Sequence, residues 1–113
     1  MFLERANRGD VDGVVALYEV DAVLADPPRL AITGIGAIRR FYERLFEGKP
    51  TFEGSTKTAL RSGDLALTST EFSISAPEPN GETKLLRSAT AEVARRQPDG
   101  TWLWVVDQPN ILS

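Results

Sequence analysis

From Gly34 onward, apolar residues recur at the spacing of an amphipathic helix, and this stripe constrains the fold more than any other feature of the sequence. The stripe consists of Ile38, Phe41, Tyr42, Leu45 and Phe46. Residues three and four positions apart lie on one face of a helix, so these side chains form a continuous apolar surface. Gly48 and Pro50 follow and are typical of a helix end. The sequence therefore predicts one long helix whose apolar face must be covered by a sheet or by other helices.

Shorter elements precede this helix. Residues 2–8 are expected to form the end of a helix closed by a glycine, and residues 10–19 a second helix with Asp10 as its N-cap. Residues 21–25 are predicted to form a strand, which stops at the rigid turn Asp26-Pro27-Pro28.

After Pro50 the pattern changes to strands separated by turn residues. The expected strands are residues 56–61, 65–75, 83–96 and 101–107. Gln97-Pro98-Asp99-Gly100 is typical of a hairpin turn between the last two. Helices followed by an antiparallel meander imply an α+β fold, with the helices on one face of the sheet. The 113 residues are enough for one domain with one core, and we assign residues 1–113 to it.

The composition excludes several classes of partner and chemistry. With a net charge of −3, the chain lacks the basic density that binds nucleic acid or an anionic membrane. It has no cysteine and no histidine, so we expect no disulfide and no metal, and acid–base chemistry falls to Asp, Glu, Tyr or Lys. The N-terminal apolar run is too short for a secretory signal, and no segment is long enough to span a membrane. We therefore expect a cytoplasmic protein that works without a cofactor.

Asp26 is the first candidate for a functional carboxylate. It stands at the end of a predicted strand, beside Pro27-Pro28 and the apolar residues Val23, Leu24 and Leu30. Burial among such neighbours raises the pKa of a carboxyl group toward the range useful for proton transfer. Alternatively, the Asp26 side chain caps the proline turn by bonding to its backbone. The residues alone leave both interpretations open.

The predicted strand 83–96 carries a second candidate on a face of small side chains. Ser88, Thr90, Glu92 and Ala94 alternate onto this face. Small side chains leave volume beside Glu92, which is typical of a cavity lining. Alternatively, Glu92 faces water and pairs with a neighbouring arginine.

The last strand contains a third carboxylate and both tryptophans. Strict alternation places Val105 and Asp107 on one face and Trp102 and Trp104 on the other. Asp107 is either a cavity carboxylate or a cap at the end of the strand. A pair of tryptophans fills a core or a dimer interface more often than it stacks on a ligand, and we expect a homodimer built on the sheet.

Several of these features occur in an order known from one superfamily. They are Gly9-Asp10 with a helix running to Tyr18, then Asp26-Pro27, then Gly34 opening a helix through Ile38-Phe41-Tyr42, and finally Asp99-Gly100-x-Trp102. In order and spacing the chain resembles the nuclear-transport-factor-2-like superfamily, and within it the SnoaL-like and ketosteroid-isomerase-like domains. This resemblance implies a cone-shaped α+β fold in which a curved antiparallel sheet wraps around N-terminal helices. It also implies an internal pocket for a hydrophobic or carbonyl-containing small molecule, and a homodimer.

The resemblance also implies roles for individual residues. Asp26 matches the general base of the ketosteroid isomerases, and Glu92 matches their second, protonated acid. Asp107 resembles the acid–base residue of the SnoaL-type cyclases, and Tyr18 and Tyr42 match tyrosines near the pocket. The position of the tyrosine that stabilises the oxyanion in the isomerases corresponds to Phe2 here, which cannot donate a hydrogen bond.

Two hypotheses about function follow. In the first, the protein is a cofactor-independent isomerase, cyclase or lyase: Asp26 removes a proton next to a carbonyl, Glu92 or Tyr42 stabilises the enolate oxygen, and Asp107 assists or replaces Asp26. In the second, it is a non-catalytic ligand-binding or dimerisation module. The residues predicted to contact the ligand are Tyr18, Tyr42, Ser88, Thr90 and Val105. The fold alone does not decide between the hypotheses, whereas a raised carboxyl pKa in a closed apolar pocket favours the enzyme.

Overall fold

The computed structural model describes residues 1–26 and 30–111, apart from the side chains of Asp26 and Leu30. In chain order its elements are α1 (Phe2–Asn7), α2 (Val11–Val15), β1 (Tyr18–Asp26), β2 (Leu30–Thr33), α3 (Ile35–Glu47), β3 (Thr51–Ser62), β4 (Leu65–Pro77), β5 (Thr83–Ala89), β6 (Ala91–Arg96) and β7 (Trp102–Gln108). Among these described residues, no helix has the length and apolar character needed to cross a bilayer.

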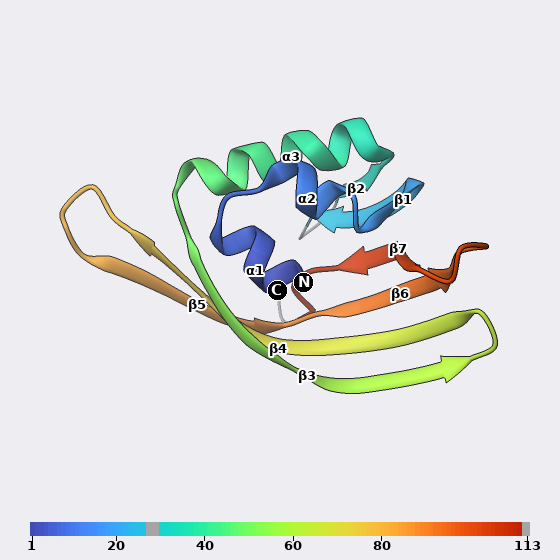
Figure 1. Ribbon diagram of the computed structural model, residues 1–113. Coiled ribbons are helices and arrows are strands. Elements are labelled where there is room, and N and C mark those ends of the chain that lie inside the picture. The colour runs from blue at the N-terminus through green and yellow to red at the C-terminus, as the bar shows by residue number, and fades with distance from the viewer. Residues whose placement is uncertain (27–29, 112–113) are drawn as a thin grey trace.

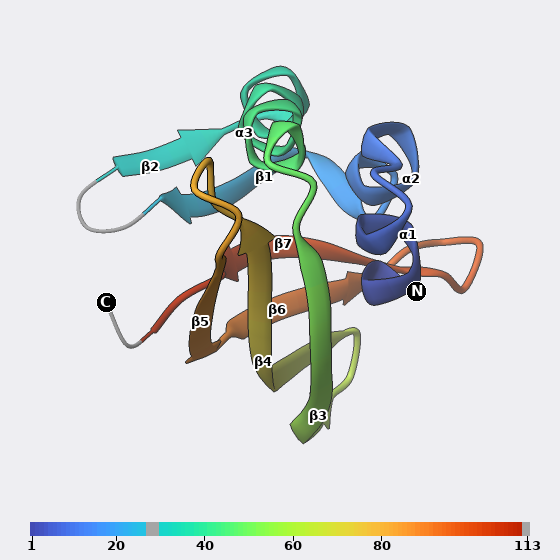
Figure 2. The same cartoon turned by 90° about the vertical axis from the view of Figure 1, so that its left-hand side faces the viewer.

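The described strands form a single curved sheet, with the helices on its concave side (Figures 1 and 2). The strand order is β2-β1-β7-β6-β4-β3, and β5 pairs with β4 as well. The pairings are antiparallel except for that of β1 with β7, which is parallel. The predicted α+β fold with a curved sheet around N-terminal helices is therefore confirmed. The observed sheet differs from a pure antiparallel meander, because β1 lies beside β7 and runs in the same direction.

Helix α3 confirms the predicted stripe. Ile38 and Tyr42 are buried, and the other three residues of the stripe are partly buried against the same core. The helix packs on β1 and β2, while α1 packs on β3. Gly34 precedes α3 with a φ of 91°, a conformation that glycine adopts without strain.

The predicted helix over residues 10–19 ends early. Asp10 is its N-cap, as expected, and accepts a hydrogen bond of 2.9 Å from the Gly13 amide. The helix stops at Val15, and Tyr18 already belongs to β1. The Trp104 amide donates a 2.8 Å hydrogen bond to the Leu17 carbonyl, so pairing with β7 takes the chain out of the helix at this point. Tyr18 therefore enters the sheet, where its side chain becomes part of the core.

The predicted strand 83–96 is interrupted at Thr90. The amide of Thr70 donates to the Thr90 hydroxyl at 3.1 Å, and the Thr90 carbonyl accepts a 2.7 Å bond from the Ser69 hydroxyl. The register is nevertheless the same on both sides, since Glu71 faces Ala89 and Thr68 faces Glu92. The alternation of faces therefore continues through the break, and β5 and β6 act as one ribbon.

A β-bulge in β7 overturns the predicted alternation of the last strand. Trp104 pairs with Ala94 and Val106 pairs with Val93, so Val105 is an extra residue without its own partner. The bulge brings Trp104 and Asp107 onto the same face. The bulge follows Trp104, so Trp102 and Trp104 stay on one face, as predicted, but this face is now the one that carries Asp107. Trp104 packs against the core, so the two tryptophans do not form an outer patch for a second copy.

We expect Ile38→Ala to lower the free energy of unfolding by about 2–5 kcal/mol, because Ile38 is fully buried on the inner face of α3 and loss of its side chain leaves a cavity. Urea unfolding measures this loss. Glu43→Ala, on the exposed face of the same helix, is the matched control and should change stability by less than about 0.5 kcal/mol. A loss as small for Ile38→Ala would contradict the packing of α3 described here.

Candidate functional site

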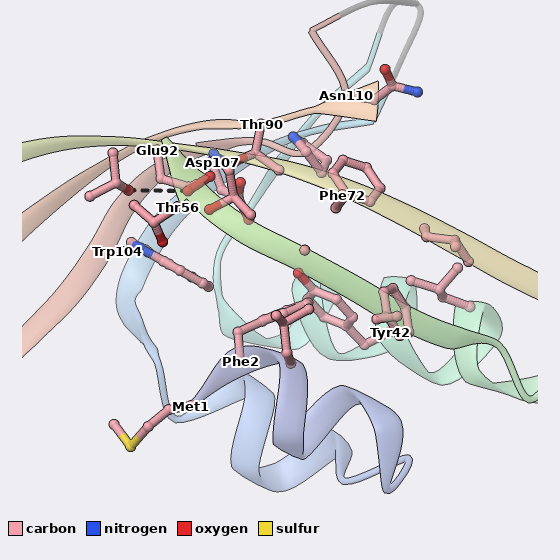
Figure 3. A pocket seen from close by; sticks show the side chains of 18 of the residues that line it. Met1, Phe2, Tyr42, Thr56, Phe72, Thr90, Glu92, Trp104, Asp107 and Asn110 are labelled. Atoms are coloured by element: carbon pink, nitrogen blue, oxygen red, sulfur yellow. Dashed lines mark hydrogen bonds between the residues drawn. The ribbon is translucent and has the colours of Figure 1, made fainter. Parts of the chain in front are cut away.

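A cavity of about 950 Å³ lies between the helices and the concave face of the sheet (Figure 3). On the helix side it is lined by apolar and aromatic side chains, including Phe2, Phe41, Tyr42 and Leu45. On the sheet side, Figure 3 shows Thr56, Thr90, Glu92 and Asp107 together, facing Phe2 and Tyr42. A concave, mostly apolar site with a few convergent polar groups is the usual form of a small-molecule site.

The sheet wall of the cavity changes from apolar to polar in successive cross-strand rows. The rows are Phe52, Ile74 and Leu86; then Gly54, Phe72 and Ser88; then Thr56, Thr70 and Thr90; and last Thr68, Glu92 and Asp107. The cavity therefore has an apolar end and a polar end, and the polar end contains two carboxyl groups.

Glu92 and Asp107 are direct partners on β6 and β7. Their exposed fractions are only 5% and 4%, and both line the cavity. Residues opposite each other in an antiparallel pair have Cβ atoms about 5 Å apart, so these carboxyl groups interact. A negative charge on one disfavours a negative charge on the other.

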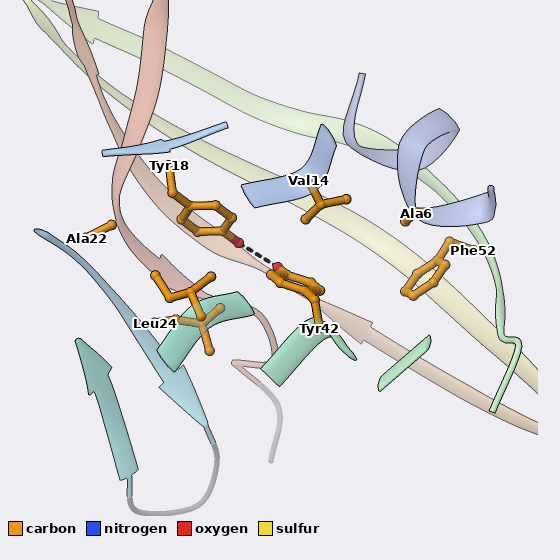
Figure 4. Close-up of a cluster of buried hydrophobic side chains, with 8 residues drawn as sticks. Ala6, Val14, Tyr18, Ala22, Leu24, Tyr42 and Phe52 are labelled. Atoms are coloured by element: carbon orange, nitrogen blue, oxygen red, sulfur yellow. Dashed lines mark hydrogen bonds between the residues drawn. The ribbon is translucent and has the colours of Figure 1, made fainter. Parts of the chain in front are cut away.

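A chain of hydrogen bonds supports Asp107 from behind the cavity. The Tyr18 hydroxyl donates to Asp107 Oδ2, and the Tyr42 hydroxyl lies 2.5 Å from that of Tyr18 (Figure 4). Since Tyr18 uses its proton for Asp107, Tyr42 is the donor to Tyr18. Burial raises the pKa of both phenols well above the usual value, which keeps them protonated as donors.

The pKa values of both carboxyl groups are raised. Burial raises the pKa of Asp107 to about 7, against the opposing effect of the Tyr18 hydrogen bond, and charge on Glu92 contributes to the rise. Burial likewise raises the pKa of Glu92, while hydrogen bonds from Thr90 and Thr68 act in the other direction. Interacting groups of this kind titrate as a pair, so the pair retains a proton close to neutral pH.

One oxygen of this pair has no partner. Glu92 Oε1 accepts a 3.1 Å bond from the Thr68 hydroxyl, whereas Glu92 Oε2 is buried without a hydrogen bond to any residue that the structure describes. A buried polar atom without a partner is costly, and at the wall of a cavity it points to a ligand.

The structure brings together only some of the residues singled out in the sequence. Tyr42, Thr90, Glu92 and Asp107 line the cavity, and Tyr18 touches Asp107 from outside it.

Besides Tyr18, two predicted contact residues do not line the cavity. Ser88 is buried, and its hydroxyl bonds to the side chain of Asn110. Val105 occupies the bulge, so the alternation that would have turned it toward the cavity does not hold. Neither residue is among those that line the cavity.

Asp26 ends β1, where its backbone pairs with Leu30. Its side chain and residues 27–29 lie outside the described part of the structure. Its place in the cavity therefore stays a prediction.

Sequence reasoning missed Trp104 and three threonines of the sheet wall, Thr56, Thr68 and Thr70. Thr68, Thr70 and Phe72 alternate along β4, and this alternation was the available signal, because residues two apart share a face. Trp104 had no such signal, since its orientation depends on the bulge.

The raised pKa of Asp107 makes stability depend on pH. Between the usual value of 3.8 and about 7, the unfolded chain has lost the Asp107 proton while the folded protein keeps it. Raising the pH through this window therefore favours unfolding. We expect urea unfolding to show a fall in stability from about pH 4 to pH 7 that is smaller in Asp107→Asn. Asp21→Asn, on the exposed part of β1, is the control and should keep the wild-type slope.

Comparison with known proteins identifies the family of the chain. Residues 1–107 match the SnoaL-like domain. No curated protein shows a significant match. Among solved structures, a ketosteroid isomerase-like protein from Erwinia carotovora atroseptica has a TM-score of 0.83 and 22% identity, and the alignment covers 95% of this chain and 85% of that one.

Two further structures agree in fold. A conserved protein from Planctomyces limnophilus has a TM-score of 0.85 and 20% identity, with 96% of this chain and 85% of that one covered. A nuclear-transport-factor-2-like protein with a cystatin-like fold, from Novosphingobium aromaticivorans, has a TM-score of 0.81 and 20% identity, with 99% and 75% covered. At these identities the likeness concerns the fold alone. The match that spans residues 1–107 shows the family: the chain belongs to the SnoaL-like domain family.

Proposed function

We propose that the protein binds an apolar carbonyl compound and transfers a proton at the carbon next to the carbonyl group, as a cofactor-independent isomerase, cyclase or lyase. The observation that carries this proposal is the buried pair Glu92–Asp107 at the polar end of a mostly apolar cavity, where Glu92 Oε2 has no partner among the described residues. The apolar rows hold the body of the ligand and the carboxyl pair receives its carbonyl end. The Erwinia protein, described as ketosteroid isomerase-like, is consistent with this type of chemistry.

The surroundings of the two carboxyl groups divide their roles. The Tyr18 hydrogen bond favours the charged form of Asp107, which makes Asp107 the base. Glu92 holds the proton, because no donor within residues 1–26 and 30–111 stabilises a charge on its Oε2.

Asp107 then removes the proton from the carbon, and the O–H of Glu92 donates to the oxygen of the enolate. Asp107 returns its proton to another carbon of the same enolate. A base whose pKa is about 7 is well matched to neutral pH.

Asp26 is retained as an alternative base, on the strength of the Asp26-Pro27 resemblance. The two assignments give different results on substitution. If Asp107 is the base, Asp26→Asn keeps its turnover. If Asp26 is the base and Asp107 only assists it, Asp26→Asn has the larger loss.

We also propose that a second copy of the chain covers the convex face of the sheet. Leu60, Leu67, Val93 and Val106 are successive cross-strand partners on β3, β4, β6 and β7. Leu60, Leu67 and Val106 are 63%, 44% and 45% exposed, which gives an apolar row on the side away from the helices. A second copy would remove this row from water. The homodimer would leave the cavity open, because the cavity lies on the other face.

We expect Asp107→Asn to lower the turnover of an unconjugated cyclic enone by about a hundredfold or more, since the amide keeps the shape of the side chain but cannot accept the proton. Formation of the conjugated enone is followed by ultraviolet absorbance. Asp21→Asn is the matched control and should retain full activity. Unchanged turnover in Asp107→Asn would refute Asp107 as the base, whereas wild-type protein that binds the enone without converting it would favour a binding module.

For the dimer, Leu67→Lys should shift light scattering from dimer to monomer at high micromolar concentration, because it places a charge in the apolar row. Glu43→Lys, on α3 at the opposite side of the sheet, should leave the dimer unchanged. A wild-type protein that is monomeric at this concentration would contradict the proposal.

A further inference from the structure

We propose that the threonine row, Thr56, Thr70 and Thr90, binds a second oxygen function of the ligand. The preferred ligand is then an apolar ring compound with two oxygen functions, a carbonyl at the carboxyl pair and a hydroxyl or second carbonyl further along the ring system. This inference rests on the proposed function, which places the carbonyl end of the ligand at the carboxyl pair, and it adds the chemical class of the ligand.

The register places these hydroxyl groups side by side on the cavity wall. Thr56 pairs with Thr70 across β3 and β4, and the Thr90 amide donates a 2.9 Å bond to the Thr70 carbonyl. All three residues line the cavity. Neighbouring strands are about 4.8 Å apart, so the row forms a continuous band of hydroxyl groups across three strands.

Two of the three hydroxyl groups are available to a ligand. The Thr90 hydroxyl accepts from the Thr70 amide and also bonds to Glu92. Within the part of the chain that the structure describes, the hydroxyl groups of Thr70 and Thr56 have no hydrogen-bond partner. Thr70 is partly buried and stands in the middle of the row, so it is the principal contact, and Thr56, which is exposed on the edge strand, is the secondary one.

The distance between rows requires a second functional group. The threonine row lies two residues along β4 from the row of the carboxyl pair, or about 7 Å. A single carbonyl oxygen therefore cannot bond to both. On the far side of the threonine row the wall becomes apolar again at Phe72 and Ile74. The second oxygen is thus fixed at one place along the ligand.

The wall opposite the threonine row includes Phe2 and the ring of Tyr42, whose hydroxyl is already bonded to that of Tyr18 (Figure 3). These aromatic surfaces contact the apolar body of the ligand. A ligand without the second oxygen would cover the Thr70 hydroxyl and leave it without water or a partner, which weakens binding. The row consequently discriminates between ligands that differ by one oxygen.

The test compares two probes, a fused bicyclic enone and its analogue with a hydroxyl group on the second ring. Quenching of tryptophan fluorescence measures the dissociation constant of each. We expect wild-type protein to bind the hydroxylated probe about tenfold more tightly, and Thr70→Val, which is nearly isosteric, to abolish this preference. Thr70→Ser keeps the hydroxyl group and should retain the preference.

Equal affinity of wild-type protein for the two probes would overturn the proposal, as would a preference that survives in both Thr70→Val and Thr56→Val. Far-ultraviolet circular dichroism establishes that each variant is folded, and the serine variant controls for effects of packing. The proposed proton transfer is tested separately by turnover in Asp107→Asn. Loss of the preference in Thr70→Val together with unchanged turnover in Asp107→Asn would support the threonine row and refute the catalytic role.

Discussion

The hydrogen-bond chain from Tyr42 through Tyr18 to Asp107 is the contact on which the site depends. It joins α3, β1 and β7, which are far apart in the sequence, and it does so inside the core (Figure 4). When Asp107 is ionised, its carboxylate accepts from Tyr18, and Tyr18 in turn accepts from Tyr42. The helix layer therefore contributes to the state of a carboxyl group on the sheet, and the packing of α3 and the chemistry of Asp107 cannot be separated.

The bulge at Val105 is the second constraint. Without the extra residue, Trp104 would point to the face opposite that of Asp107, and the aromatic wall and the acid–base pair would lie on different sides of β7. With it, Trp104 packs on Phe2 and Tyr18, with ring centroids 5.8 and 5.2 Å away. One inserted residue thus sets both the shape of the cavity and the surroundings of the carboxyl pair.

Most of the fold could be predicted from local patterns, and the site only in part. The apolar stripe of α3 and the alternation of Thr90 and Glu92 depend on periodicity, which the sequence carries directly. The end of α2 at Val15 depends on pairing between β1 and β7, whose paired residues are more than eighty positions apart in the sequence. The placement of Trp104 and Asp107 on one face depends on the bulge in the pairing of β7 with β6. Asp107 was a candidate from its place at the end of the last strand, and the family resemblance gave it a role. Its bond to Tyr18 required Tyr18 to be on a strand, and the helical pattern predicted otherwise.

The polarity of the cavity follows from how the sheet is built. Each cross-strand row takes one residue from each of several strands. A change from apolar side chains at Phe52 to polar ones at Asp107 therefore requires the residue types on β3, β4 and the β5–β6 ribbon to change together from row to row. The continuous register through Thr90 makes this possible, because a shift of one residue would turn every side chain of β6 to the other face. Burying Glu92 and Asp107 side by side opposes folding at neutral pH, since it disfavours their charged forms. Hydrogen bonds from Tyr18, Thr68 and Thr90 to those carboxyl groups offset part of this unfavourable desolvation at the polar end of the cavity.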